Sequence, residues 1–99
     1  MTAPKSPSNE PIIAVVTIVN RRGLHARAAA KFCAVAGAYD AAVRVVKDDI
    51  TVGGRSIMGL LMLGAGAGST VKIVATGLQA SEVADALVRL VADKFGEGE

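Results

Sequence analysis

Apolar and polar residues follow two periods along this chain, one typical of strands and the other of helices. Runs that are rich in β-branched residues and alternate loosely with polar ones predict strands. These runs are Ile12–Val19, Ala42–Val46, Ile50–Val52 and Thr70–Thr76. Apolar residues at helical spacing occupy three segments between and after these strands. The pattern therefore predicts the order strand, helix, strand, strand, helix, strand, helix.

The first predicted helix covers Ala26–Ala36 and is rich in alanine. Gly37 follows directly and can end it. Its apolar residues recur at helical spacing, and we expect them to form the buried stripe: Ala26, Ala29, Ala30 and Cys33, widened by Phe32 and Val35. Because so many of these side chains are small, we expect the helix to lie close against a sheet.

Two serines are candidate N-caps, since a serine oxygen can accept a hydrogen bond from the free N–H groups of a first helical turn. Ser56 follows a Gly-Gly pair and opens a short helix that ends near Leu61. Ser81 opens the last helix, with Glu82 favourably placed in the first turn. That helix stops before Gly96 and carries its apolar residues on one face: Ala84, Leu87, Val88, Val91 and Phe95.

Two connections complete the predicted fold. Lys47-Asp48-Asp49 joins two strands as a tight hairpin. Gly64–Gly68 is a glycine-rich connection that lacks the lysine and the following helix of a P-loop. Four strands with helices segregated to one face predict an α+β fold: an open sandwich in which a four-stranded, mostly antiparallel sheet carries three helices, in the order βαββαβα.

Length and composition narrow the class of protein. At 99 residues the chain suffices for one domain, which we expect at 12–96, with a flexible tail at 1–11 and a short tail at 97–99. One cysteine excludes an internal disulfide, and one histidine beside it makes a metal cluster implausible. No apolar run is long enough to span a membrane and no signal peptide is visible, so we expect a cytoplasmic monomer.

Basic residues are concentrated in one part of the chain, although the net charge is only +2. Pro11 to Tyr39 holds no acidic residue, whereas four basic ones fall there: Arg21, Arg22, Arg27 and Lys31. This part of the molecule should present a positive face suited to phosphate or to an acidic partner protein. The small net charge and an aromatic content of 3% give no support for nucleic-acid binding.

The only histidine, His25, stands in the segment Gly23-Leu24-His25-Ala26-Arg27 at the expected start of the first helix. Backbone N–H groups point outward there, and the positive end of the helix disfavours a charged imidazolium. A neutral imidazole with a guanidinium two residues away is suited to receive a phosphoryl group. The alternatives are an exposed histidine without a function, and an Arg27 that is ordinary surface charge.

Two motifs carry a resemblance to a known family. Gly23-Leu24-His25-Ala26-Arg27, followed by Ala29-Ala30 and Phe32, resembles the active-site signature of the HPr family, the histidine phosphocarriers of bacterial phosphotransferase systems. Ser56-Ile57-Met58-Gly59-Leu60 resembles the regulatory-serine segment of that family. The resemblance extends from Ile12 to Phe95 and implies the HPr-like open-faced β-sandwich. One departure is Ala28, where many members have proline.

The resemblance implies a stoichiometric phosphoryl carrier without a cofactor, rather than a self-sufficient enzyme. His25 would accept a phosphoryl group from enzyme I, which is charged from phosphoenolpyruvate, and pass it to an enzyme IIA-type protein. Arg27 would face the phosphate. Ser56 has two open roles, as a helix cap and as a regulatory site for a serine kinase and phosphorylase. The residues implied in partner binding are Ala26, Ile57, Met58 and Leu61.

Two questions stay open at this point. The carrier could serve sugar transport or a nitrogen-related regulatory branch. It could instead be a docking module of the same fold that is never phosphorylated and binds partners through Ile57 and Met58. A self-sufficient histidine phosphatase is disfavoured, because no acid-base partner for His25 is evident in the sequence.

Overall fold

The structure, a computed structural model, describes residues 10–97 of the chain. The expected tail at 1–11 falls almost entirely outside the described residues, as do residues 98 and 99 of the expected C-terminal tail.

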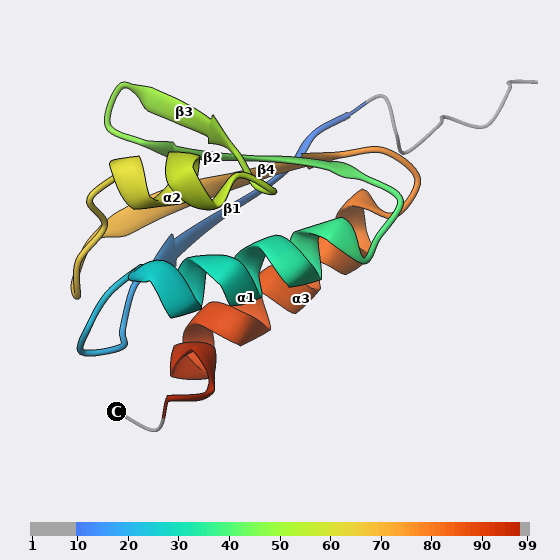
Figure 1. Cartoon of the computed structure of the whole chain (residues 1–99). Helices are drawn as coiled ribbons and strands as arrows, with labels where there is room; N and C mark the ends of the chain where they lie inside the picture. The colour runs from blue at the N-terminus through green and yellow to red at the C-terminus, as the bar shows by residue number, and fades with distance from the viewer. Residues whose placement is uncertain (1–9, 98–99) are drawn as a thin grey trace, which may run out of the picture.

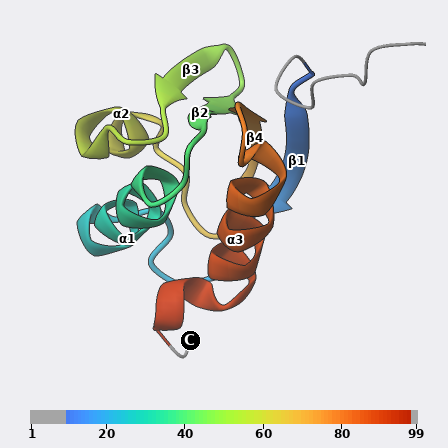
Figure 2. The ribbon, with the colours of Figure 1, turned by 90° about the vertical axis from the view of Figure 1, so that its right-hand side faces the viewer.

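Four antiparallel strands form one sheet in the order β1-β4-β2-β3 (Figure 1). The strands are β1 (Ile12–Thr17), β2 (Ala42–Lys47), β3 (Ile50–Gly53) and β4 (Thr70–Thr76). The helices α1 (Ala26–Gly37), α2 (Ile57–Met62) and α3 (Ala80–Ala92) all lie on one side of this sheet (Figure 2). The predicted α+β open sandwich and its βαββαβα order are confirmed.

Strand boundaries agree with the pattern to within one residue except at the end of β1. The predicted hairpin is present, because Lys47 pairs with Ile50 across the turn at Asp48 and Asp49. Asp48 has a φ of 54°, a left-handed conformation that aspartate tolerates better than most residues. β1 ends at Thr17 rather than Val19, because the pairing shifts by one residue at Ile18: its N–H donates to the Ser69 carbonyl at 2.8 Å, but its carbonyl accepts from the Gly68 N–H at 2.7 Å.

Helix α1 contacts the core through a stripe that partly matches the one predicted. Ala28, Ala29, Phe32 and Ala36 are its buried residues, whereas Ala26 and Ala30 are exposed. The prediction was therefore right at Ala29 and Phe32, and Cys33 and Val35 pack partly buried against the core, whereas Ala26 and Ala30 were wrongly placed in the stripe. Phe32 decides the orientation, because burying the one large side chain of the helix removes the most apolar area from water. Cys33 is half-buried, and burial raises the pKa of its thiol, which keeps the thiol protonated.

Both ends of the last helix differ from the prediction. Gln79 rather than Ser81 precedes α3, and Ser81 is an exposed residue inside the first turn. Ala80 is buried, and its packing moves the start of the helix forward along the chain. The helix ends at Ala92, before Phe95, which belongs to a separate 3₁₀ turn at Lys94–Gly96 and is fully buried there.

The two predicted serine caps give a matched comparison. Ser56 precedes α2, and its Oγ accepts the Gly59 N–H at 2.9 Å, as predicted. We expect Ser56→Ala to lower the free energy of unfolding by about 1 kcal/mol, because that N–H loses its partner. Ser81→Ala should leave it within about 0.5 kcal/mol of the wild type, since alanine suits a helix interior. Urea denaturation measures both, and equal losses would contradict the assignment of the caps.

Candidate functional site

His25 is the N-cap of α1, as the sequence predicts. Its backbone is extended, with φ −78° and ψ 179°, and its carbonyl accepts the Ala29 N–H at 2.8 Å, which starts the helix. The ring Nδ1 accepts the Arg27 N–H at 3.3 Å, so this nitrogen faces the free N–H groups of the first turn. The imidazole is only 16% exposed, and the protein therefore holds its orientation.

The loop before His25 is supported by the glycine-rich loop that follows α2. Leu24 donates its N–H to the Ala65 carbonyl at 2.9 Å and buries its side chain. Gly23 has a φ of 69°, and a Cβ at this position would lie 2.7 Å from the Ala65 oxygen and from the Gly66 Cα. The loop at 64–68, predicted only as a connection, thus supports the chain just before the histidine.

Asn20 holds the other side of this loop and was missed by the sequence reasoning. It is fully buried, and its side-chain amide donates to the Gly23 carbonyl at 2.8 Å. The same NH₂ group donates to the Glu97 carboxylate at 3.0 Å. Both partners are acceptors, which settles that the nitrogen of the amide faces them.

Glu97 brings the C-terminal segment to the histidine. One carboxylate oxygen pairs with the Nε2 of His25, while the other accepts from Asn20. The sequence reasoning placed Glu97 in the C-terminal tail and found no acid-base partner for His25. That second conclusion was wrong, because Glu97 contacts His25. The contact leaves no local signal in the sequence, since it joins residues 72 positions apart.

Basic side chains surround this arrangement, as the charge distribution predicted. Arg22, Arg27 and Lys31 line an open depression of about 300 Å³ together with Gly96 and Glu97. Lys31 also donates its ammonium to the Phe95 carbonyl at 2.6 Å, which ties α1 to the C-terminal turn. Three cations face one carboxylate here, so the depression retains positive potential for an anion.

The surroundings of Glu97 favour its charged form. Hydrogen bonds from Asn20 and from His25, with the electrostatic attraction of His25 and Arg22, hold the pKa of the Glu97 carboxyl below its ordinary value of 4.5. Glu97 therefore carries a full negative charge at neutral pH.

Helix α2 presents the predicted apolar surface, except that Met62 contributes to it more than Leu61 does. Ile57 and Met58 are 42% and 69% exposed, and Met62 is 73% exposed. Leu61 is half-buried and contributes less to this surface than Met62. Helix α2 lies beside α1 in both views (Figures 1 and 2), and Ala26 is exposed at the start of α1.

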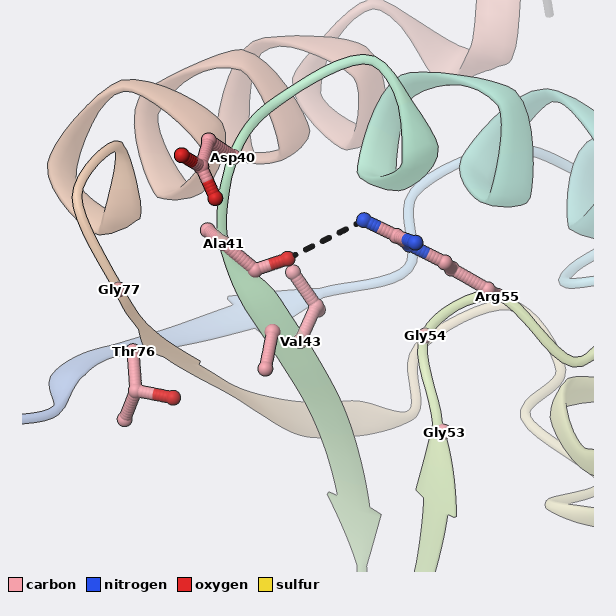
Figure 3. Close-up of a pocket in the computed structure, with 9 residues that line it drawn as sticks. Asp40, Ala41, Val43, Gly53, Gly54, Arg55, Thr76 and Gly77 are labelled. Carbon is pink, nitrogen blue, oxygen red and sulfur yellow. Dashed lines mark hydrogen bonds between the residues drawn. The ribbon is translucent and has the colours of Figure 1, made fainter.

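A larger hollow of about 600 Å³ lies at the opposite end of β4 from the histidine loop (Figure 3). Arg55, one of its polar side chains, donates to the Ala41 carbonyl at 3.3 Å and so braces the link between β3 and α2. In residues 10–97, no group of three or more His, Cys, Asp or Glu side chains could hold a metal ion. None of the helices in this range is long and apolar enough to cross a membrane.

Gly23 provides a test of the supporting loop. Gly23→Ala should lower the free energy of unfolding by about 2–4 kcal/mol, because a Cβ there is strained and meets backbone atoms that cannot easily move. Gly64→Ala is the matched control: its φ is 62°, but no atom lies within 4 Å of its Cβ position. We expect about 1–2 kcal/mol there, from backbone strain alone. Equal losses in thermal or urea unfolding would contradict the close approach.

The charge on Glu97 can be tested by pH titration. In carboxyl ¹³C NMR of the full chain, Glu97 should titrate with a midpoint below 4.5, and Asn20→Ala should raise that midpoint because it removes the leading hydrogen bond. The stabilisation from Glu97 is present above the unfolded-state pKa and is lost as the pH falls through the lower folded-state pKa. A midpoint at or above 4.5 in the wild type would contradict the hydrogen-bonded geometry.

Comparisons with known proteins agree with this geometry. The family model described as the PTS HPr component phosphorylation site matches residues 13–93. Phosphocarrier protein HPr of Cupriavidus necator is 47% identical over 83 residues, covering 84% of this chain and 93% of the relative. The HPr of Pseudomonas aeruginosa is 48% identical over 85 residues, covering 85% and 94%.

A solved structure gives the same result. The crystal structure of an HPr from Thermoanaerobacter tengcongensis superposes with a TM-score of 0.84 at 41% identity, covering 87% of this chain and 97% of that one. With a histidine cap, a cationic depression and sequence similarity over most of its length, this chain belongs to the HPr family of phosphotransferase-system phosphocarriers.

Proposed function

We propose that this protein accepts a phosphoryl group from enzyme I on His25 and passes it to an enzyme IIA-type protein in a phosphoenolpyruvate-dependent relay. The observation that carries the proposal is the position of His25. Its Nδ1 faces the first turn of α1, and Glu97, which pairs with its Nε2, lines a depression open to solvent together with Arg22, Arg27 and Lys31. Membership of the HPr family supports the same assignment.

The geometry suits reversible transfer. The Nδ1 lone pair attacks phosphorus, an N–P bond forms, and the electron pair of the breaking bond returns to the donor's nitrogen. The arriving charge meets the first-turn N–H groups and the Arg27 guanidinium. The phosphoryl group can leave these groups again when a second protein presents a competing site. The protein therefore acts as a stoichiometric carrier, and we propose that it does so in the cytoplasm.

The exposed apolar surface supports docking of both partners. Ile57, Met58 and Met62 are exposed on α2, which packs against α1, and Ala26 is exposed at the start of α1. Methionine adapts to different partner shapes, which suits a surface shared by a donor and an acceptor. We assign Leu61 a packing role at the edge of this surface, because it is half-buried.

Ser56 lies where a modification would affect that surface. It is exposed and directly precedes Ile57, while its Oγ caps α2. A phosphate added by a serine kinase and removed by a phosphorylase would place negative charge beside the apolar docking surface. This would oppose an acidic partner, and we propose it as the regulatory mechanism at this site.

Incubation with phosphoenolpyruvate and enzyme I tests the carrier function. Intact mass and ³¹P NMR should show one acid-labile phosphoryl group, absent from His25→Ala. Arg27→Ala should slow transfer about ten- to a hundredfold, because one charged hydrogen-bonding partner of the phosphate is lost. Arg44→Ala, at an exposed arginine of β2, should transfer at the wild-type rate.

The result also separates the carrier from a docking module. An unlabelled wild type, with folded protein and active enzyme I, would leave partner binding through Ile57 and Met58 as the function. In that case His25→Ala would bind the partner as tightly as the wild type. Labelling that survives in His25→Ala would place the phosphoryl group on another residue and overturn the assignment of His25.

A further inference from the structure

The C-terminal turn is built to return Glu97 to the histidine. Lys94, Phe95 and Gly96 have φ values of 56°, 55° and 75°, three consecutive left-handed conformations of which two are not at glycine. Such strain persists only where the surroundings determine it. Phe95 is fully buried, and Lys31 donates to its carbonyl at 2.6 Å, so packing and a charged hydrogen bond hold the turn against α1.

Both oxygens of the Glu97 carboxylate have a defined partner. One accepts from Asn20, which is fully buried and is held in turn by the Gly23 carbonyl. The other pairs with His25 Nε2. A carboxylate accepts only, so the hydrogen between these two groups resides on Nε2 when the imidazole is neutral. The lone pair then lies on Nδ1, which already accepts the Arg27 N–H.

We propose that Glu97 is a positioning residue for phosphoryl transfer, holding the Nε2–H tautomer and the ring orientation of His25 from a carboxylate that Asn20 fixes in place. This inference rests on the proposed carrier function. It adds a role for the C-terminal turn that the histidine motif does not contain.

The carboxylate also has an electrostatic role during transfer. When Nδ1 forms the bond to phosphorus while Nε2 keeps its proton, the neutral ring becomes formally positive. The donor's nitrogen takes the electron pair of the bond that breaks, and no proton needs to leave His25. The negative charge of Glu97 faces the ring as its positive charge develops, and so stabilises the transition state more than the ground state.

Arg22, Arg27 and Lys31 face the carboxylate across the depression and partly balance its charge. Glu97 contacts the ring at Nε2, whereas the phosphoryl group would attach at Nδ1. This separation limits direct repulsion between the carboxylate and the arriving phosphate.

Two variants of Glu97 in the full chain test the proposal, with a matched control on α3. Glu97→Ala removes the carboxylate. Glu97→Gln keeps the size of the side chain, but its amide has one acceptor oxygen, whereas the carboxylate accepts from both Asn20 and His25. Glu82→Ala removes an exposed glutamate from α3. Ring ¹⁵N NMR of neutral His25 reads the tautomer, and rapid mixing with phosphorylated enzyme I over a range of concentrations reads kcat and KM.

In the wild type and in Glu82→Ala, we expect the Nε2 signal at the protonated position and the Nδ1 signal at the unprotonated one. In both Glu97 variants the two signals should approach each other, with kcat about tenfold or more lower and KM within about twofold of the wild type. Unchanged tautomer signals, or shifted signals with wild-type kcat, would overturn the positioning role.

The same experiment distinguishes this inference from the function on which it rests. A wild type that accepts no phosphoryl group would overturn both together, although the NMR spectrum would still report the contact with Glu97. A labelled wild type with kinetically unchanged Glu97 variants would overturn the inference alone.

Discussion

The hydrogen bonds of one buried amide hold the histidine site together. Asn20 is the only buried polar or charged residue recorded in residues 10–97, and a buried amide that lost its partners would be strongly destabilising. Its two acceptors are the Gly23 carbonyl in the loop before the histidine and the carboxylate of Glu97 near the C-terminus. Pairing the NH₂ of this one side chain with both acceptors therefore brings together the two segments that set the position of His25.

The packing of α1 complements this polar constraint. Alanines at 28, 29 and 36 are completely buried, and small side chains allow a helix axis to approach the sheet closely. Phe32 fixes the rotation of the helix about that axis. The first turn is thus held by the core on one side and by Asn20 and Ala65 on the other, which limits the movement of the N-cap side chain.

Local signals predicted the fold and half of the site. Strand periodicity, the cap at Ser56 and the cap at His25 were all visible within a few residues, and each is found in the structure. Ser81 shows the weakness of the same argument, since the packing of Ala80 overrode its capping preference. Asn20 and Glu97 could not be predicted because their side chains meet across 77 positions of sequence. The only local hint was Gly96, which allows the chain to turn before Glu97.

The two nitrogens of the His25 ring have different electrostatic surroundings, and this asymmetry matters for a carrier. Nδ1 lies toward the helix N–H groups, which attract a phosphoryl group, whereas Nε2 lies on a carboxylate, which supports positive charge in the ring. A site with cations alone would bind phosphate tightly and release it slowly. The Glu97 carboxylate offsets part of that attraction while it supports the nucleophile, so one side chain can favour both arrival and departure of the same group.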